Sequence, residues 1–468
     1  MRNKTPQIYY NVKVLEAVSE GNCVAKIEND LVVFIPYAAP GDVVDIQITH
    51  KRKSFRYGKI IKFHSYSADR LEPFCEYYGL CGGCKWQHLS YQAQTDFKQK
   101  QVYDAITRIG KVCEPNILPI IAAQKTQYYR NKLEFTFSNF RWMTDGEYGN
   151  DEQRNLNGLG FHLPGKFDRI VDINKCFLQA DPSNDIRNFV RNYAIKHDLT
   201  FYNVKKHSGL LRNLIIRQST NNGLMVILVV AEDDKQSFFP LLEEMKKNFN
   251  QITSLLYVFN DKFNDDIFDR DVIVYHGDDH LVESMEDLNF IVGAKSFYQT
   301  NHEQAYNLYK VARNFAELTG NEVVYDLYTG TGTIANFVAK SAKKVIGIEY
   351  VEQAIIDAKQ NSAFNKIKNT EFFEGDMAKI LTDEFIATHG KPDVVITDPP
   401  RAGMHADVVN MLIKHKIPKI VYVSCNPATQ ARDINMMLEH YKVIKVQPVD
   451  MFPHTHHVEN VALLELKG

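Results

Sequence analysis

Val323-Val-Tyr-Asp-Leu-Tyr-Thr-Gly-Thr-Gly-Thr333 is the stretch that decides the fold of the C-terminal part of the chain. An apolar run typical of a buried strand ends near Asp326, and a turn with two glycines follows, where a backbone can bend sharply and approach a ligand closely. A second apolar strand ends in Glu349, where a carboxylate can accept the ribose hydroxyls of a nucleotide. The two strand ends together predict a site for an adenosine-containing cofactor.

The spacing of the glycines distinguishes between two such cofactors. A dinucleotide site has the pattern G-x-G-x-x-G and places pyrophosphate at a helix N-terminus. Here the pattern is D-x-x-x-G-x-G, starting at Asp326, and no third glycine follows. A leading carboxylate suits a cationic ligand without phosphate, and a third strand ends close to Asp376, where an adenine amine could be held. We therefore expect S-adenosylmethionine rather than NAD, in a site that also includes Thr333.

Apolar runs alternate with helical patterns from residue 300 onward. Asn301-His-Glu-Gln304 resembles a capping box at the start of the first helix. The expected strands are Val323–Leu327, Val345–Ile348, Thr370–Phe373, Val394–Thr397, Ile420–Val423, Val443–Val446 and Val461–Leu466. Such alternation predicts a mostly parallel, doubly wound sheet with helices on both faces, and ligands bind such sheets beyond the C-terminal ends of the strands.

Two further strand ends carry candidate reactive groups. Asp398-Pro-Pro-Arg401 resembles the loop with which many base-modifying methyltransferases hold a planar substrate. Enzymes that act on exocyclic amines usually have an aromatic residue where Arg401 stands, so amine methylation is disfavoured. The next strand ends in Ser424-Cys-Asn-Pro427. A lone cysteine is more often packing than a nucleophile, but Cys425 stands where a substrate would bind.

A thiolate at Cys425 fits one methyl-transfer problem. Carbon 5 of uracil is barely nucleophilic, and attack of a thiolate on carbon 6 makes an enolate whose carbon 5 can accept a methyl group. The proton on carbon 5 must then leave, which requires a base. Glu459 precedes the last strand and is our candidate, with a surface carboxylate as the alternative. His454, His456 and His457 precede it, and we expect loop or substrate contacts from them rather than a metal site.

The N-terminal residues have the pattern of a small β-barrel. The expected strands are Ile8–Leu15, Cys23–Ile27, Leu31–Ile35, Val43–Ile48 and Tyr57–Phe63. Turn residues separate them, and five short strands at this spacing suggest a closed barrel. Lys51, Arg52, Lys53 and Arg56 alternate with aromatic residues between the last two strands. Cations and rings together are typical of a groove for single-stranded nucleic acid, although a solvated hairpin would have the same composition.

Four of the seven cysteines indicate a metal site. Cys75, Cys81 and Cys84 are close in sequence, and Cys176 could be a distant fourth ligand. Such a set suits an iron–sulfur cluster or zinc, and spacing alone does not separate the two. Zinc would more often show two close pairs, although His88 keeps a Cys3His zinc site open.

Composition limits the remaining possibilities. The 468 residues carry 55 Lys and Arg against 57 Asp and Glu, so the protein is not coated in positive charge, but a local basic face remains possible. The longest apolar stretch, Gly223–Ala231, is far shorter than the roughly 20 residues of a membrane span. The first residues lack the apolar segment of a secretory signal. We expect a soluble, cytoplasmic monomer without a membrane partner.

We expect three domains. A β-barrel spans 1–66, a mixed α/β central domain with the cysteine set spans 67–295, and a Rossmann-like domain spans 296–468. A polar insertion at 144–158 is the segment that looks least structured.

The motifs together resemble those of the bacterial and archaeal RNA uracil-5 methyltransferases, which make 5-methyluridine, and the resemblance covers nearly the whole chain. The N-terminal piece is similar to that family's RNA-binding TRAM barrel, and Phe297-Tyr-Gln-Thr-Asn301 to its F-x-Q-x-N motif. The glycine-rich loop and the motifs around Asp398, Cys425 and Glu459 follow in the family's order.

The resemblance implies roles for these residues. Gln299, Tyr328, Glu349 and Asp398 would contact S-adenosylmethionine, Cys425 would be the nucleophile and Glu459 the general base. Arg130, Lys132 and Arg212 lie in segments that look like family segments near RNA. The cysteine set would hold a [4Fe–4S] cluster, as in members that act on large-subunit ribosomal RNA.

The expected reaction is therefore methylation of carbon 5 of a uridine, with 23S ribosomal RNA favoured over transfer RNA as the substrate. Two other classes stay open. One is a methyltransferase for carbon 5 of cytosine or for an exocyclic amine. The other is a non-catalytic, iron–sulfur RNA-binding sensor.

Overall fold

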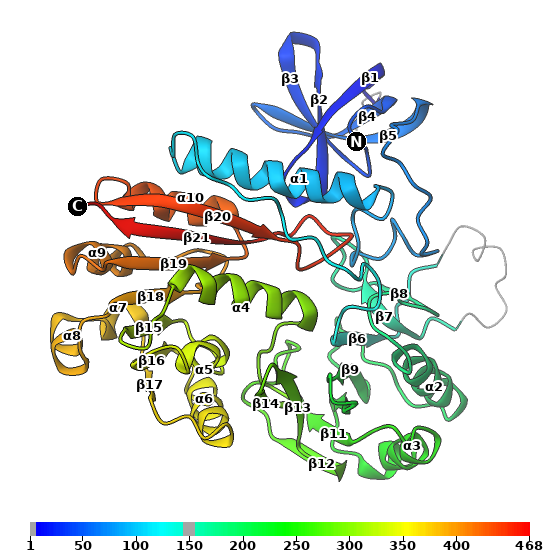
Figure 1. The fold of residues 1–468 in the computed structure, drawn as a ribbon. Coiled ribbons are helices and arrows are strands. Elements are labelled where there is room, and N and C mark those ends of the chain that lie inside the picture. Colours follow the sequence, from blue (N-terminus) through cyan, green and yellow to red (C-terminus); the bar gives the residue numbers. More distant parts are fainter. Residues whose placement is uncertain (1–5, 144–154) are drawn as a thin grey trace.

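The computed structural model describes residues 6–143 and 155–468, which form three parts (Figure 1). An N-terminal barrel lies at the top of the view, a C-terminal sheet at the left and a central domain at the lower right. Most of the insertion expected at 144–158 lies outside the described residues. Within the described ranges, we find no helix with the length and apolar character required to span a bilayer.

The N-terminal barrel is closed in the strand order β1-β2-β3-β5-β4, which confirms the predicted barrel. Alternate apolar residues such as Val14, Val33 and Val44 fill its interior, because successive side chains of a strand point to opposite faces. The strands are β1 (Ile8–Ala17), β2 (Asn22–Ile27), β3 (Leu31–Pro36), β4 (Val43–Lys51) and β5 (Phe55–Ser65).

The central domain is a seven-stranded sheet in the order β12-β11-β10-β9-β6-β7-β8. Its strands are β6 (Lys132–Ser138), β7 (Gly158–His162), β8 (Ile170–Asp172), β9 (Leu211–Gln218), β10 (Leu224–Val230), β11 (Ser254–Phe259) and β12 (Val272–Gly277). The helices α2 (Ser183–Lys196) and α3 (Lys235–Asn248) bury Val190 and Phe238 in a core shared with Phe135 and Leu228 of the sheet.

The C-terminal sheet has the order β17-β16-β15-β18-β19-β21-β20. The first five strands are parallel, and the last two run antiparallel to their neighbours. The strands are β15 (Val323–Leu327), β16 (Lys344–Glu349), β17 (Thr370–Glu374), β18 (Val394–Thr397), β19 (Lys419–Ser424), β20 (Tyr441–Val449) and β21 (Glu459–Leu466).

Helices cover both faces of this sheet, as the sequence predicts, and two apolar cores lie on either side of it. The helices are α4 (His302–Ala316), α5 (Thr333–Ala339), α6 (Glu352–Phe364), α7 (Met377–Ile380), α8 (Asp383–His389), α9 (Ala406–Lys414) and α10 (Pro427–Met437). Asn301 caps α4 by accepting the backbone N–H of Gln304 at 3.3 Å, so the predicted cap is confirmed.

Two segments expected in the central domain also pack against the C-terminal domain. The helix α1 (Tyr91–Asp104) continues into a π-helical turn, η3 (Ala105–Ile109), and its apolar residues join the core around α10. The hairpin β13 (His280–Met285) and β14 (Leu288–Gly293) packs against α4 and α6. Periodicity identifies an amphipathic helix but does not indicate which sheet it covers, so packing departs from the expected boundary at residue 296.

Candidate active site and cysteine-lined cavity

The loop after β15 has an unusual backbone that leaves open space. Tyr328, Gly330 and Gly332 all have positive φ, at 63°, 55° and 74°. A Cβ on Gly332 would stand 2.9 Å from Ala358 Cβ, whereas a Cβ on Gly330 would meet nothing within 4 Å. The glycine at 332 is therefore required by packing, and the surface at Gly330 is free to approach a ligand.

Asp326 is the buried carboxyl group beneath this loop. It is fully buried, one oxygen is held by the Thr329 hydroxyl, and Oδ1 has no hydrogen-bond partner. Burial raises the pKa of Asp326 to about 7. A buried acceptor without a partner is costly, and an ammonium or sulfonium ligand above the loop would relieve that cost. This orphaned oxygen fits the binding of S-adenosylmethionine.

Glu349 is oriented by three backbone N–H groups. Its Oε2 accepts from Gly330 at 3.1 Å, and its Oε1 accepts from Tyr350 at 2.8 Å and Val351 at 3.1 Å. A carboxylate has about four acceptor sites, and three of them are used here, so Oε2 can still accept a ribose hydroxyl. The predicted position beside the glycine loop is thus where the side chain lies.

The other predicted cofactor residues border the same loop. Thr333 is the first residue of α5, and Asp376 caps α7 by accepting from Ala378 N at 3.1 Å. Gln299 lies in the segment before α4, where its carbonyl oxygen accepts from Asn131 Nδ2 of the central domain at 3.1 Å. The Thr331 hydroxyl reaches the neighbouring Phe297 carbonyl at 3.5 Å, which joins this segment to the glycine loop.

Cys425 and Glu459 lie next to each other because of strand register. In the antiparallel pair β19 and β21, Ser424 is opposite Asn460. Cys425 follows the first of these residues and Glu459 precedes the second, so the two candidate reactive groups extend from the same end of the sheet. Asp398 follows the adjacent strand β18. The structure therefore brings the three strand-end candidates together.

The charges around this group oppose ionisation. Burial raises the pKa of the Cys425 thiol to about 11, and the charges of Glu459 and Asp398 raise it further while Arg401 lowers it. Burial also raises the pKa of Glu459 to about 8 and that of Asp398 to about 6. The site without ligands thus holds protons on groups that the expected chemistry needs ionised.

The loop between β20 and β21, residues 450–458, forms one wall of the site and is held from both sides (Figure 1). Lys98 Nζ donates to Asp450 Oδ1 at 2.5 Å, and both side chains are fully buried. Tyr129 Oη donates to the Pro453 carbonyl at 3.0 Å. These contacts come from residues far away in the sequence, and sequence reasoning missed them because no motif marks a buried lysine.

The rings of His456 and His457 pack in a tilted arrangement on this wall, with centroids 4.1 Å apart. Burial lowers the pKa of His456 to about 3 and that of His457 to about 4, with Arg401 among the nearby cations that contribute. Both rings are thus neutral at physiological pH, and each can offer one donor and one acceptor. The expected loop or substrate contact from these rings stays a prediction.

The four candidate ligand cysteines line one small cavity between the cysteine loop, residues 75–87, and the central domain. Cys75, Cys81, Cys84 and Cys176 surround about 30 Å³, together with apolar neighbours such as Leu178. Burial, together with the other thiols of the set, raises the pKa of Cys81 and Cys84 to about 12. A cationic metal group would favour the thiolates, so the donor set fits a metal group.

Among the described residues, no three His, Cys, Asp or Glu side chains are close enough to hold one ion. His88 is occupied elsewhere: its Nδ1 contacts the Tyr78 hydroxyl and its Nε2 lies 3.0 Å from the Ala38 carbonyl. The open Cys3His alternative therefore loses its histidine.

The predicted RNA contacts divide into three groups. Lys51, Arg52 and Lys53 are exposed at the end of the β4–β5 hairpin, and Arg56 is half-buried there. Arg130 and Lys132 are half-buried beside the α4 cap, where Arg130 pairs with Asn301 and lies over the Phe452 ring at 5.7 Å.

Arg212 requires a correction. Its side chain is 1% exposed, and its guanidinium donates to the Asn260 carbonyl at 2.7 Å and to Asp265 at 2.9 Å. It also lies 4.3 Å from the Tyr202 ring. A cation that is buried and hydrogen-bonded in this way holds the loop after β11 in place and is not accessible to phosphate.

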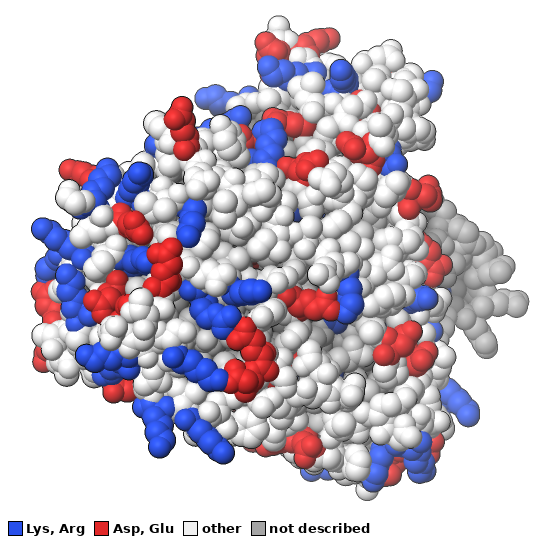
Figure 2. Space-filling view, in the orientation of Figure 1, with Lys and Arg blue, Asp and Glu red and all other residues white. Residues whose placement is uncertain are grey.

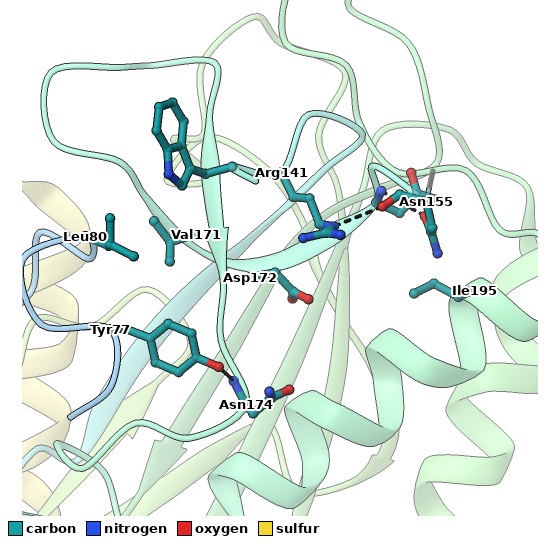
Figure 3. Close-up of a pocket in the computed structure, with 10 residues that line it drawn as sticks. Tyr77, Leu80, Arg141, Asn155, Val171, Asp172, Asn174 and Ile195 are labelled. Atoms are coloured by element: carbon teal, nitrogen blue, oxygen red, sulfur yellow. Dashed lines mark hydrogen bonds between the residues drawn. The ribbon is translucent and has the colours of Figure 1, made fainter. Parts of the chain in front are cut away.

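Two surface features lie apart from the strand ends. A polar pocket of about 400 Å³ opens between the cysteine loop and β8, with Arg141 and Asp172 extending into it (Figure 3). None of the described residues that line it is one of the predicted site residues. Figure 2 shows basic and acidic side chains intermixed at the left edge, over α8 and α9, so this part of the surface has no single sign of charge.

Two residues of the site were not assigned a role from sequence. Arg401 lies beside Cys425, and sequence had used it only to disfavour amine methylation. Gln94 is fully buried and joins the cysteine loop to the 450–458 wall. The Asp-Pro-Pro-Arg motif could have indicated a role for Arg401. Gln94 lies in a helix with many polar residues, and no sequence pattern distinguishes it from them.

Comparisons with known proteins agree with this geometry. A family model described as tRNA (Uracil-5-)-methyltransferase matches residues 267–467, and a TRAM domain model matches residues 8–61. A Bacteroides thetaiotaomicron protein described as an uncharacterized RNA methyltransferase is 58% identical over 453 residues, which cover 96% of this chain and 100% of that protein. A Porphyromonas gingivalis protein with the same description is 51% identical, over 97% of this chain and 99% of its own.

One solved structure is similar over the full length. It is the tRNA (uracil-54, C5)-methyltransferase of Pyrococcus abyssi in complex with S-adenosyl-L-homocysteine. The two chains are 28% identical, with a TM-score of 0.74 and coverage of 97% of this chain and 99% of that one. The similarity confirms the expected architecture of a TRAM barrel followed by mixed and Rossmann-like domains.

Proposed function

The chain belongs to the RNA uracil-5 methyltransferase family, and on that premise we propose that it methylates carbon 5 of a uridine in RNA through a covalent bond to Cys425. The register that sets Ser424 opposite Asn460 carries this proposal, because it brings a thiol and a carboxyl group side by side at the end of the sheet. The methyl donor is S-adenosylmethionine, which supplies an electrophilic methyl group.

The first half of the reaction makes carbon 5 reactive. The Cys425 sulfur, as thiolate, forms a bond to carbon 6 of the uracil, and the electron pair of the ring double bond moves toward oxygen 4 as an enolate. Carbon 5 then forms a bond to the methyl group, and the bond between that methyl and sulfur in the donor breaks. S-adenosylhomocysteine and a methylated, enzyme-bound uridine result.

The second half releases the product. Glu459, as carboxylate, takes the proton from carbon 5, the double bond between carbons 5 and 6 reforms, and the bond from carbon 6 to Cys425 breaks. Thiolate and 5-methyluridine are regenerated, so atoms and electrons balance. The target base must leave its stack to reach a strand end inside the protein, as enzymes that act on bases require.

The residues that would hold the donor are those around the glycine loop. Asp326 and Asp398 would face its positive groups, and Glu349 would accept its ribose hydroxyls. Tyr328, Thr333, Gln299 and Asp376 would complete the site. Support comes from the orphaned oxygen of Asp326 and the open space at Gly330.

Two substitutions test the covalent mechanism. Cys425→Ala should abolish 5-methyluridine formation while S-adenosylmethionine still binds. Glu459→Gln should accumulate a protein–RNA adduct that survives denaturing gel electrophoresis, because the proton cannot be removed. Formation of 5-methyluridine by the alanine variant would remove Cys425 from the mechanism, and fast turnover by the glutamine variant would reassign the base.

The alternatives predict other products. Mass spectrometry of nucleosides from treated RNA would show 5-methylcytidine or an amine-methylated base for the other methyltransferase classes. RNA binding without methyl incorporation would indicate a non-catalytic sensor.

We propose ribosomal RNA, and 23S ribosomal RNA in particular, as the substrate. The support is the four-cysteine cavity, which the sequence resemblance associates with members that act on large-subunit ribosomal RNA. The similar Pyrococcus abyssi enzyme is a transfer RNA methyltransferase, so the test must include both substrates. Deleting the gene and mapping 5-methyluridine should remove the mark from 23S ribosomal RNA; loss from transfer RNA alone would overturn the assignment.

We propose that the cavity holds a [4Fe–4S] cluster, with Cys75, Cys81, Cys84 and Cys176 as its ligands. Such a cluster would tie the cysteine loop to the central domain. Anaerobically purified protein should show iron, acid-labile sulfide and visible absorption, all lost in Cys176→Ser. Zinc without sulfide would overturn the cluster in favour of a single ion.

A further inference from the structure

Arg401 is fixed beside the candidate nucleophile by backbone contacts. Its carbonyl oxygen accepts from Asn426 Nδ2 at 3.1 Å and from the Thr429 hydroxyl at 3.2 Å. Asn426 directly follows Cys425 and caps α10 by accepting from Ala428 N at 3.1 Å. The loop that carries Arg401 is therefore attached to the turn that carries the cysteine.

A second set of bonds keeps the same loop on α10. The Met404 N–H donates to Asp433 Oδ2 at 2.8 Å, and Arg432 donates to the Ala402 carbonyl at 2.9 Å. Asp433 is fully buried and also accepts from Tyr422 Oη at 2.6 Å. The 400–404 backbone is thus held at both ends, and Arg401 can place its side chain without moving the main chain.

Arg401 lowers the pKa of the Cys425 thiol through its charge and through a side-chain hydrogen bond. The residue as a whole is exposed. The charge of Arg401 also lowers the pKa values of Glu459, His456 and His457. An arginine stays protonated at every pH at which the protein is folded.

The titratable groups that act on Cys425 come from two elements. Glu459 begins β21 and Asp398 lies in the loop after β18, and both are carboxyl groups that disfavour a thiolate. Arg401 lies in the same loop as Asp398 and is the cation that acts on this thiol. The nucleophile that the proposed function requires therefore has two carboxyl groups and one cation around it, and that cation favours its ionisation.

We propose that Arg401 is a catalytic residue that stabilises the Cys425 thiolate before it attacks carbon 6. This inference rests on the proposed function. The thiol proton leaves to solvent, the guanidinium keeps its own protons, and the sulfur electron pair forms the bond to carbon 6. When that bond breaks at the end of the cycle, the same guanidinium receives the thiolate again.

The test measures thiol reactivity without RNA or methyl transfer. Full-length protein is treated with iodoacetamide between pH 6.5 and 9.5, and the alkylated Cys425 peptide is quantified by mass spectrometry. Arg401→Gln should slow alkylation at pH 8 by at least tenfold and shift its pH profile upward by at least one unit. Arg401→Lys should lie between Arg401→Gln and the wild type because it keeps the charge.

The chain offers matched controls. Cys113 is exposed, so its alkylation in the same samples should be equal in all variants. Arg108→Gln removes a cation that is 71% exposed on the turn after α1, and it should leave Cys425 unchanged. Retained binding of S-adenosylmethionine shows that the site of Arg401→Gln is intact, and Arg401→Lys serves if that variant does not fold.

An identical pH profile in wild type, Arg401→Gln and Arg401→Lys would overturn the inference. Loss of methylation with that result would mean that Arg401 only binds RNA, for example a phosphate beside the target base. A failure of the proposed function would be seen in a different experiment. Formation of 5-methyluridine by Cys425→Ala would overturn that function, whatever the alkylation profile of the arginine variants.

Discussion

The carbonyl oxygen of His454 accepts a hydrogen bond from the backbone N–H of Lys85 at 2.9 Å, and a second one from Trp86 at 3.0 Å. Lys85 directly follows Cys84 of the cysteine cavity, and His454 lies in the 450–458 wall that leads to Glu459. The cavity and the candidate active site are therefore joined by direct main-chain contacts. A change in the cysteine loop should be felt by the wall of the active site.

Gln94→Leu tests this connection. The Gln94 side chain donates to the carbonyl groups of Trp86 and Leu89 at 3.1 and 3.0 Å and accepts the His454 N–H at 2.7 Å. Because leucine removes these three hydrogen bonds, and a buried group left unpaired costs roughly 1–3 kcal/mol, we expect unfolding in urea at lower concentration and slower methylation. Gln92→Leu is the control, because Gln92 lies on the same helix and is exposed. Equal stability of the two variants would contradict the prediction.

Lys98→Met should be strongly destabilising. The substitution leaves Asp450 buried without its cation, and breaking a buried pair in this way typically costs about 3–5 kcal/mol. Lys100→Met is the matched control on the same helix, because Lys100 is 45% exposed and exposed ion pairs contribute roughly 0–1 kcal/mol. Denaturation of both variants by guanidinium measures the difference. A loss for Lys98→Met no greater than that for Lys100→Met would contradict a stabilising buried ion pair between Lys98 and Asp450.

Binding of S-adenosylmethionine should strengthen with rising pH. The pKa of Asp326 is raised to about 7 and that of Asp398 to about 6, so both groups are largely protonated at pH 5.5 and ionised by pH 8. A cationic ligand binds the ionised forms better, and its binding therefore releases protons. Titration calorimetry in two buffers should show this release near pH 6.5. Asp326→Asn should bind more weakly at pH 8 and lose most of the pH dependence; an unchanged slope would contradict the role of Asp326.

The raised pKa values also predict the direction in which stability changes with pH. A carboxyl group whose pKa is higher in the folded protein stabilises the folded state fully below its unfolded pKa, and this contribution is lost as pH rises through the folded value. For Glu459 the loss extends from about 4.5 to about 8. The protein without ligand should therefore have a lower melting temperature at pH 8 than at pH 6, and Glu459→Gln should reduce that difference. The prediction would be contradicted if the melting temperature of the wild type rose from pH 6 to pH 8 while that of Glu459→Gln did not. Glu459 would then not be buried in its neutral form.

The fold was predictable where local pattern determines it. Alternating apolar residues identified the barrel, and the glycine loop with Glu349 identified the cofactor end of the sheet. Cys425 and Glu459 were chosen as candidates because chemistry at strand ends restricts the choice, and the register of β19 and β21 brings these two residues together. Contacts between distant segments, such as Lys98 with Asp450, depend on how the domains dock, and no local pattern encodes that.

Arg212 is a residue to which the sequence assigned a role that the structure contradicts. Sequence offers a basic residue in a segment similar to one near RNA, but it cannot distinguish a cation that faces solvent from one that is fully buried. The terminal nitrogens of the guanidinium donate to carbonyl oxygens of the loop after β11, whereas its buried Nε has no hydrogen-bond partner. Burial of a planar group with five donors requires such a set of acceptors, and only the folded loop supplies it.

A salt titration of RNA binding should distinguish an exposed cation of the barrel from the buried Arg212. Each phosphate contact to single-stranded nucleic acid contributes about 0.7 to the slope of log affinity against log salt. Lys53→Gln removes an exposed charge at the end of the β4–β5 hairpin, so we expect weaker RNA binding, a slope reduced by about that amount and unchanged stability. Arg212→Gln should lower stability while RNA binding by the protein that remains folded keeps its slope. Fluorescence anisotropy with a labelled RNA fragment measures both variants, and a slope that falls for Arg212→Gln but not for Lys53→Gln would place the RNA on the central domain instead of the barrel.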